Sequence, residues 1–456
     1  MLKKLGLWIA FLACVASAQN HYIIRLNGGS TITSIAGRLG LQVVATLGGS
    51  ASGLYVVNSP LAPSLLTPIL QLTPGVLNVE VDAAVALPEV SKSSQLNAGP
   101  PNLSAINTWI APYIGKTQIN PYTGANEWSA YQNQPAAGIV RIVAAHQFAT
   151  GAGTVAILDT GVDFTHPVLA GSTVLGWDFV NNLPGGYATA ADLSTSTGSI
   201  LDQSTTSILD QSTTSILDSN STVILDQSTT SILDQSTTSI LDGTPATMPI
   251  NEYGHGTMTA GLIHLVAPTA RLLPVKVFDV NGGSCLSLLL QGIYYSVDQG
   301  AKVISMSFSM KQGSAELQRA IAYANSKNVL LVAAAGNEGQ PIVVYPAGYS
   351  PTVGVGSTNN QDVRSTFSNY GSVVALAAPG EGLITTYPQN RYAAGWGTSF
   401  SAPLVAGGAA LLAQMNSQVT ASSATQAFSH AVKVGQGLGA GRLDLSQALG
   451  AFTTGH

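Results

Sequence analysis

The stretch TVAILDTGVD, residues 154–163, is the segment from which the fold can be predicted. Thr154 and four apolar residues lead to Asp159, and Gly161 follows two positions later. A short, nearly uninterrupted apolar run bounded by glycine is typical of a strand buried on both faces. We therefore expect residues 154–159 to form an inner strand with Asp159 at its carboxyl end.

Four later stretches have the same character as this strand. Helical stretches lie among them at 286–299 and 314–326, and in the second Leu317, Ile321 and Ala324 share one face. Buried strands alternating with helices predict an α/β fold, a three-layer domain with a mostly parallel sheet covered by helices on both faces. Ligands of such sheets bind beyond the carboxyl ends of the strands. The four stretches are KVISMSF (302–308), VLLVAAAG (329–336), TVGVGS (352–357) and VVALAAP (373–379).

The chain before this domain divides into two parts. Residues 19–90 are expected to form a small α+β unit, and residues 91–137, rich in Ser, Asn, Pro, Gly and Gln, a linker or N-terminal arm. The larger domain then occupies 138–456. Within the small unit we expect strands at 21–26, 53–59 and 75–87 and helices near 31–39 and 61–71.

An insertion at about 185–246 interrupts the larger domain with a repeat. Residues 201–240 are five eight-residue units, LDQSTTSI four times and LDSNSTVI once. A period of eight does not keep one helical face, and Ser/Thr-rich sequence forms helices poorly. We interpret the repeat as a solvated loop, with a small stacked β-element or an adhesive surface as the alternative.

The amino terminus has the features of a secretory signal. Lys3 and Lys4 precede an apolar run, Leu5 to Val15, and small residues follow up to Ala18. The run is too short to span a bilayer. We expect residues 1–18 to be removed and the protein to be secreted, either to the extracellular space or to a periplasm. Of the two cysteines, Cys14 lies in this signal, so we expect no disulfide within the processed protein.

Composition excludes several classes of partner. Charged residues are 9% of the 456 residues, and the formal net charge is −5. Without a basic cluster beyond Lys3-Lys4, nucleic acid is not an expected partner. Outside the signal no stretch is apolar for long enough to cross a membrane, so we expect no span in the mature chain.

Four polar residues are placed to carry chemistry. Asp159 ends a predicted strand, His255 stands between two glycines before a helical run, and Ser399 begins another helical run with Pro403 in its first turn. Asn337 follows an apolar strand and a glycine. A serine becomes a nucleophile when a base takes its proton and donors hold the oxyanion, and these residues could supply both at one sheet edge.

The motifs around these residues resemble those of the subtilisin-like serine proteases. DTGVD, HGTMTAG, AAAGNEG and GTSFSAP occur in that order, and Asp, His, Ser is the subtilisin order of triad residues. The resemblance covers about 138–456, and residues 19–90 resemble the family's inhibitory propeptide. It implies a secreted serine endopeptidase, made as a self-processing zymogen, that hydrolyses peptide bonds through an acyl-enzyme.

Roles for individual residues follow from the resemblance. Ser399 would be the nucleophile, His255 the general base and then acid, and Asp159 the residue that orients the imidazole. Asn337 and the Ser399 N–H would form the oxyanion hole. Ser307, Phe308 and Ser309 would bind the substrate backbone on one side of the pocket, and Ala334, Ala335 and Gly336 would line the other side.

Two departures from the family affect these expectations. The family usually has glycine where Ser309 stands, so the pocket for the residue before the cut is expected to be narrower. The chain after HGTMTAG lacks the loop in which many relatives hold calcium. Asp163 is therefore without the other calcium ligands that the family usually has. We therefore expect no required cofactor and identify no metal ligands; calcium elsewhere stays open. The partners implied are polypeptide substrates and the chain's own propeptide, and we expect a monomer.

Other classes of protein fit the sequence less well. A related family of acid-acting serine peptidases uses Glu as base and Asp in the oxyanion hole, where this chain has His255 and Asn337. An esterase would need a G-x-S-x-G elbow, which GTSFS lacks. The alternative from a different class is a catalytically silent scaffold that displays the repeat for binding. A missing triad residue would favour that alternative, and none is missing from the sequence.

Overall fold

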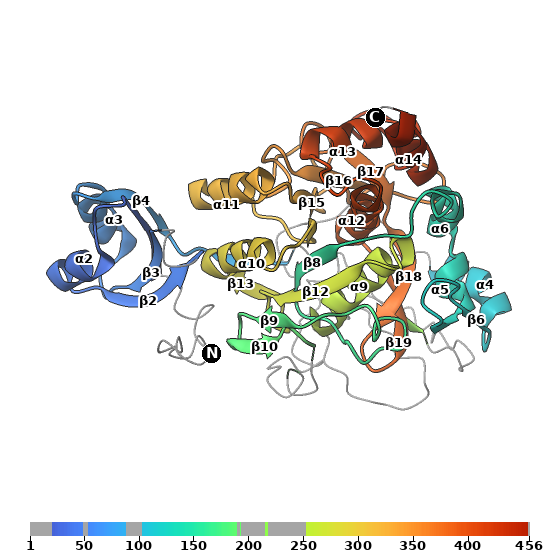
Figure 1. Cartoon of the computed structure of the whole chain (residues 1–456), viewed down its shortest axis with the longest axis horizontal. Helices are drawn as coiled ribbons and strands as arrows, with labels where there is room; N and C mark the ends of the chain where they lie inside the picture. Colours follow the sequence, from blue (N-terminus) through green and yellow to red (C-terminus); the bar gives the residue numbers. More distant parts are fainter. Residues whose placement is uncertain are drawn as a thin grey trace.

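The computed structural model describes residues 21–48, 53–87, 103–188, 192, 215–217 and 252–454. The predicted signal at 1–18, the segment 88–102 and most of the 201–240 repeat lie outside the described residues. The described chain forms a small unit, an arm and a large domain (Figure 1).

The large domain is built on an eight-stranded sheet of order β10-β9-β12-β8-β14-β15-β16-β17. Every neighbouring pair from β9 to β17 is parallel, and only β10 runs antiparallel to its neighbour. The predicted α/β class is confirmed. The strands are β8 (Thr154–Asp159), β9 (Gly176–Asp178), β10 (Leu183–Gly185), β12 (Arg271–Lys276), β14 (Val303–Met306), β15 (Leu330–Ala334), β16 (Val353–Thr358) and β17 (Leu376–Pro379).

The side chains of β8 explain the layers. Val155 and Ile157 belong to one hydrophobic core, while Ala156 and Leu158 belong to another on the opposite face. Successive strand residues point to opposite faces, so an apolar run fills both cores. The first core is covered by α9 (His255–Val266), α12 (Thr398–Met415), α13 (Ala421–Phe428) and α14 (Leu445–Thr454), and the second by α10 (Leu286–Asp298) and α11 (Ala315–Ser326).

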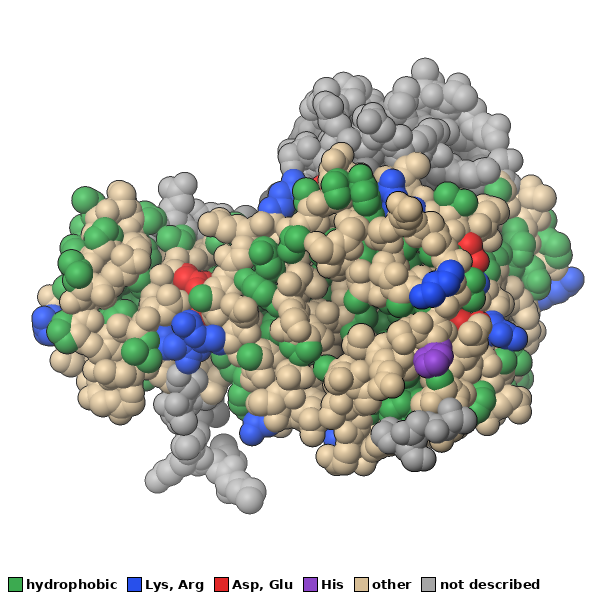
Figure 2. Space-filling view, turned by 90° about the horizontal axis from the view of Figure 1, so that it is seen from above, with side chains coloured by type: hydrophobic (Ala, Val, Ile, Leu, Met, Phe, Trp, Pro, Cys, Tyr) green, Lys and Arg blue, Asp and Glu red, His purple; other side chains and the backbone are tan. Residues whose placement is uncertain are grey.

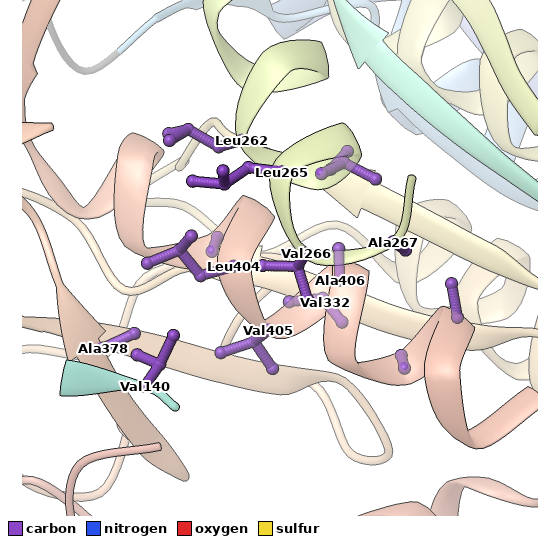
Figure 3. Packing of buried hydrophobic residues seen from close by; sticks show 14 of the residues in the cluster. Val140, Leu262, Leu265, Val266, Ala267, Val332, Ala378, Leu404, Val405 and Ala406 are labelled. Atoms are coloured by element: carbon purple, nitrogen blue, oxygen red, sulfur yellow. The ribbon is translucent and has the colours of Figure 1, made fainter. Parts of the chain in front are cut away.

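Helices α9 and α12 pack closely together against the sheet. Leu262, Leu265 and Val266 of α9 face Leu404 and its neighbours on α12 (Figure 3). A side chain at Gly407 would overlap Val266, so this glycine permits the approach. The contact fixes two helix amino termini, those that begin with His255 and Thr398, at the same edge of the sheet.

Several strands were not expected from the sequence, among them β12 and β2 (Gln42–Leu47). β12 contains Pro274, which has no N–H for a ladder and therefore argued against an inner strand. The strand nevertheless lies between β8 and β9. In the small unit, β2 was also missed.

The small unit is a four-stranded antiparallel sheet of order β2-β3-β1-β4. On β1, Tyr22 and Ile24 pack toward α2 and α3, whereas Ile23 joins the core beneath α10 and α11. One face of the sheet therefore carries its own helices, and the other rests on the large domain (Figure 1). Its elements are β1 (His21–Leu26), α2 (Ile32–Leu39), β3 (Leu54–Asn58), α3 (Pro63–Gln71), β4 (Val76–Val81) and β5 (Ala84–Ala86).

The arm before β8 packs against the large domain. Trp128 and Tyr131 are buried in the core shared with α9 and α12, and the Tyr131 hydroxyl donates to the Gly261 carbonyl at 2.6 Å. Its elements are α4 (Leu103–Ile110), β6 (Thr117–Ile119), β7 (Asn126–Trp128), α5 (Ser129–Asn133), α6 (Pro135–Ile139) and α7 (Ile142–Ala145).

Part of the repeat is described as a strand. β11 (Ser215–Leu217) pairs antiparallel with β19 (Arg391–Trp396), which also pairs with β18 (Glu381–Tyr387). At least these three residues depart from the solvated loop that we expected. The role of the repeat stays open.

Three further observations concern the chain as a whole. Charged side chains are few and scattered on the face drawn in Figure 2. Within the described ranges, no helix is long and apolar enough to cross a membrane. Cys285 is the N-cap of α10 and is fully buried, and the absence of a disulfide from the processed protein stays a prediction.

Candidate active site

Asp159 and His255 are joined at the carboxyl edge of the sheet. Asp159 is 1% exposed, and its Oδ1 lies 2.7 Å from His255 Nδ1. It also accepts hydrogen bonds from the Thr160 N–H at 2.7 Å and from Thr259 Oγ1 at 3.2 Å. Because the aspartate acts as acceptor throughout, Nδ1 of His255 carries the ring proton and Nε2 presents its lone pair.

The glycines beside His255 allow this approach. A side chain on Gly256 would overlap the Gly161 carbonyl, and one on Gly254 would overlap the ring of Tyr387. Gly161 itself has a φ of 107°, a conformation that favours glycine. The motif glycines therefore let α9 begin against the end of β8.

Ser399 lies in the first turn of α12. The ring of the next residue, Phe400, has its centroid 5.6 Å from that of His255, so the start of α12 lies close to the histidine. The first N–H groups of a helix have no partner within it and carry the positive end of the dipole. This placement suits a residue near which negative charge develops.

Pro403 lies one turn later than we expected, because α12 begins at Thr398. Proline has no N–H, so the carbonyl of Ser399, four residues earlier, loses its helical partner. The Ser307 hydroxyl donates to that carbonyl at 2.9 Å instead, and Ser399 Oγ donates to the Ser307 carbonyl at 3.3 Å. The end of β14 is thereby tied to the serine.

The side-chain amide of Asn337 is oriented by Thr398. Its Oδ1 accepts from both the N–H and the hydroxyl of Thr398, each at 2.8 Å. Because two groups donate to this side-chain atom, it must be the amide oxygen. A flipped amide would place its NH₂ group against the Thr398 N–H, where no hydrogen bond can form. Asn337 is 2% exposed, and its Nδ2 has no hydrogen-bond partner. A buried amide N–H₂ without a partner is available to a ligand.

The predicted substrate residues flank Ser399 in two segments. Ser307 and Phe308 follow β14, and Ala334, Ala335 and Gly336 end or follow β15. The Phe308 side chain is fully buried against Phe278, with ring centroids 5.3 Å apart, so only its backbone could meet a substrate. Ser309 is half-buried. The binding roles stay predictions.

His166, which stands seven positions after Asp159 in the sequence, is held by hydrogen bonds to backbone groups. His166 Nε2 donates to the Arg391 carbonyl at 2.9 Å, and Nδ1 accepts from the Val168 N–H at 3.3 Å. Burial lowers the pKa of His166 to about 4, against a weaker raising effect of the Arg391 hydrogen bond. It is a neutral structural residue at physiological pH.

Both carboxylate oxygens of Asp163 accept hydrogen bonds. Asp163 Oδ1 accepts from the N–H and hydroxyl of Thr165, and Oδ2 accepts from the Gln389 N–H. No cluster of three or more His, Cys, Asp or Glu side chains that could hold a metal occurs in this part of the chain. Oδ1 of Asp163 is thus used in a local turn, and Oδ2 in a contact with a segment more than 200 positions away.

Three residues beside the site were missed from the sequence. Thr259 binds Asp159, Thr398 orients Asn337, and Asn369 donates to the carbonyl of Ala335 and to Glu338. Thr259 could have been suspected, because it stands four residues after His255 and so on the same helix face. Nothing in the sequence places Asn369 near the site.

Comparisons with known proteins agree with this geometry. The model of the Subtilase family matches residues 151–450. Thermitase of Thermoactinomyces vulgaris is 36% identical over 280 residues, which is 59% of this chain and 78% of thermitase. Subtilisin BL of Lederbergia lenta is 39% identical over 183 residues, 38% of this chain and 67% of that protein.

A solved structure shares the fold. Fervidolysin from Fervidobacterium pennivorans, described as a keratinolytic enzyme related to subtilisin, aligns with a TM-score of 0.64 at 19% identity. The alignment covers 98% of this chain and 62% of fervidolysin.

The fold, the sheet-edge site and these relatives define a serine-type endopeptidase, whose substrates are polypeptides. The match over residues 151–450 identifies its family: the chain belongs to the subtilases. The resemblance inferred from the four motifs is thereby confirmed.

Proposed function

We propose that this chain is a secreted, self-processing zymogen whose peptidase activity depends on an Asp159–His255–Ser399 triad. The observation that carries the proposal is the 2.7 Å contact between Asp159 Oδ1 and His255 Nδ1, made at the sheet edge where α12 begins with Ser399 in its first turn. An aspartate in this position holds the imidazole tautomer and stabilises its charged form.

The chemistry follows from these positions. His255 Nε2 takes the Ser399 Oγ proton as Oγ attacks the scissile carbonyl carbon, and the carbonyl oxygen becomes an oxyanion. Asn337 Nδ2 and the Ser399 N–H donate to that oxyanion. His255 then gives its proton to the leaving amine as the C–N bond breaks. Water hydrolyses the acyl-enzyme by the same steps in reverse and restores Ser399.

The unit at 19–90 would act as an inhibitory propeptide. Asp82 accepts from the Ser287 N–H at 2.8 Å and from its hydroxyl at 2.6 Å, in the first turn of α10. Glu80 accepts from Ser314 Oγ at 2.5 Å and from the Glu316 N–H at 3.2 Å, in the first turn of α11. Side-chain oxygens at these positions satisfy N–H groups that a helix leaves without a partner, so the unit supplies caps to two helices of the large domain.

A salt bridge adds to this docking. Arg25 of the unit donates to Glu316 Oε2 from Nε at 2.8 Å and from Nη2 at 2.6 Å. Asn78 donates to the other oxygen, Oε1, at 2.9 Å. Glu316 is fully buried and also pairs with Arg319 of its own helix, so the propeptide adds partners to a buried carboxylate.

The carboxyl-terminal end of the small unit pairs with a strand of the large domain. β5 pairs antiparallel with β13 (Gly283–Cys285), and the Leu87 N–H donates to the Gly282 carbonyl at 2.9 Å. Leu87 is fully buried. Addition of an extended segment to a sheet edge is a common mode of peptide recognition. This pairing supports a role of residues 84–87 in filling the substrate-binding cleft before self-cleavage.

Secretion is supported by the sequence of residues 1–18, and the mature enzyme would work as a monomer without a required cofactor. The silent-scaffold alternative would need a displaced triad residue, and the Asp159–His255 contact does not favour it.

The test is the intact mass and N-terminal sequence of the purified chain, wild type beside Ser399→Ala. We expect the wild type to lose its N-terminal unit and the variant to keep it after signal removal. If both remain full length, the silent-scaffold alternative gains support. If both are cut alike, another protease does the processing and the zymogen proposal fails.

A further inference from the structure

One edge of β19 is occupied by a strand from the repeat. Residues 215–217 pair antiparallel with residues 392–394 of β19, so that Ile216 lies opposite Ala393. β18 pairs with the other edge of β19, and β11 therefore covers the edge that β18 leaves open. An open strand edge presents N–H and C=O groups that another extended segment can bind. This outer edge of β19 is thus a strand-binding site that holds one occupant.

The three residues of β11 recur along the repeat. Each copy is followed by Asp, and neighbouring copies are eight positions apart. Ile favours a strand and Asp disfavours one, which explains why β11 ends at Leu217. The copies other than β11 lie outside the described residues. Ser-Ile-Leu stands at 199–201, 207–209, 215–217, 231–233 and 239–241, and Val-Ile-Leu stands at 223–225.

β19 has room for one of these triplets at a time. It is six residues long, whereas neighbouring triplets are eight positions apart, so one extended segment cannot place two triplets on it. The triplets differ only at their first position, which is Ser or Val. In the register of β11 that position lies opposite Ala394, whose small side chain discriminates little between the two. The edge therefore has no means of selecting one copy by its sequence.

The chain around the repeat is long enough to bring other triplets to the same place. Asp192 is held by the buried Lys276 at the end of β12, and the described chain resumes at Glu252. Triplet 207–209 begins 15 positions after Asp192, and triplet 231–233 ends 19 positions before Glu252. Fifteen extended residues span up to about 50 Å. Loop-closure entropy changes slowly with loop length, so the central triplets compete on nearly equal terms.

We propose that the outer edge of β19 is a binding site for a Ser/Val-Ile-Leu segment, and that the repeat supplies several interchangeable occupants, one bound at a time. The occupant comes from the same chain, because tethering gives it an effective concentration that a second molecule does not match in dilute solution. The hydroxyls of Thr385 and Thr386 tie β18 to carbonyls of α9 at 2.7 Å, so the hairpin keeps its place whichever triplet is bound. Because β19 ends at Trp396, three positions before Ser399, the bound triplet covers the strand that leads to the proposed nucleophile.

The test is hydrogen exchange of β19 in the full-length Ser399→Ala precursor, in which self-cleavage cannot cut the repeat. One variant carries Ile216→Pro and Leu217→Pro, and a second carries paired prolines at the last two positions of all six triplets. Successive strand residues point their N–H groups to opposite sides, so one of two adjacent prolines always removes a donor to β19. Exchange is followed by mass spectrometry of peptides that contain residues 391–396.

The two variants should behave very differently. We expect the single-triplet variant to raise the exchange rate of the outward N–H groups of β19 less than about 1.5-fold, because another triplet takes the vacant place. The six-triplet variant should raise it at least about tenfold, since an edge that was covered more than about nine-tenths of the time is then always open. If the single-triplet variant exchanges as fast as the six-triplet variant, residues 215–217 are a unique occupant and the proposal is wrong. If the six-triplet variant exchanges as slowly as the unmodified repeat, the triplets do not cover β19 and the proposal also fails.

Two controls complete the experiment. Gln211→Pro with Ser212→Pro, and the equivalent changes in the other four units, place prolines between the triplets and should leave exchange of β19 unchanged. Faster exchange in this control would contradict a role of the triplets themselves. Exchange of β19 should also be independent of protein concentration over an about fiftyfold range. A dependence on concentration would assign the occupant to a second molecule and overturn the same-chain proposal. Protection of β8 in each variant checks that the large domain is folded.

Discussion

Thr398 holds Asn337 by its amide oxygen. The backbone N–H and the hydroxyl of Thr398 both donate to Asn337 Oδ1 at 2.8 Å, which turns the amide nitrogen away, buried and without a partner. A donor fixed in advance needs no reorganisation when an oxyanion forms. The residue before the proposed nucleophile thus prepares the proposed oxyanion donor.

Replacing Asn337 should cripple the enzyme without abolishing activity. Loss of one oxyanion donor of this kind lowers kcat about 10²–10³-fold with little change in KM. Asn337→Asp is a matched variant, because it keeps the shape and lacks the N–H₂ group. Steady-state kinetics on one peptide checks this, and turnover within threefold of the wild type would refute the role of Asn337.

Thr398→Val should have a smaller effect on the same step. The variant removes the hydroxyl that binds Asn337 Oδ1 and Gly336 N–H but keeps the backbone donor. A net hydrogen bond is worth about 1 kcal/mol, so we expect kcat to fall about three- to tenfold. Thr259→Val, which loses a bond to Asp159 instead, is a useful comparison. An unchanged kcat in Thr398→Val would mean that the backbone N–H alone fixes the amide.

Asp159→Asn should leave a folded protein that turns over very slowly. An asparagine can present N–H₂ to His255 Nδ1 and so favours the wrong tautomer, which in a comparable triad lowers kcat about 10⁴-fold. Circular dichroism would check the fold, and kinetics the rate. A loss of less than tenfold would argue that His255 does not depend on Asp159.

Docking of the N-terminal unit should weaken as the pH rises from about 4 to about 6. Burial raises the pKa of Asp82 from 3.8 to about 6, although the hydroxyl and N–H of Ser287 act in the opposite direction. A carboxyl whose folded-state pKa is raised contributes its stability below the unfolded pKa and loses it as the pH passes the folded pKa. The difference corresponds to about 3 kcal/mol between pH 4 and pH 7.

The free energy of unfolding of the Ser399→Ala precursor, measured from pH 4 to pH 7, tests this. Ser399→Ala/Asp82→Asn is the matched control, because Asn has a similar shape and does not titrate. We expect the precursor with Asp82 to lose stability relative to the control as the pH rises. Parallel pH profiles would contradict the assignment to Asp82.

Much of the fold follows from local sequence. The apolar run at 154–159 predicts β8, and Leu317, Ile321 and Ala324 are all fully buried on one face of α11, as their spacing predicts. β12 was missed because Pro274 disfavours an inner strand and only the neighbouring strands compensate for it. Whether a proline-containing segment forms an inner strand therefore depends on its pairing with segments that are distant in the sequence.

The main residues of the site could be predicted from the sequence, but the hydrogen bonds that connect them to their neighbours could not. Asp159, His255, Ser399 and Asn337 stand in recognisable motifs, and the structure brings them to one edge. The link from Pro403 to Ser307 through the Ser399 carbonyl depends on two elements that are 96 positions apart in sequence (307 and 403). Contacts of Lys311 and Asn369 with Glu338 likewise depend on how separate loops meet.

The most direct test of the central claim is labelling of the processed enzyme with a fluorophosphonate, followed by peptide mass mapping. Such a probe reacts with a serine that a base has activated. We predict one adduct per molecule, on Ser399. The His255→Ala variant, from which added wild-type enzyme has removed the N-terminal unit, should give no adduct although Ser399 is still present. Labelling of another serine, or no labelling of a folded and processed enzyme, would contradict the assignment of Ser399 as the nucleophile.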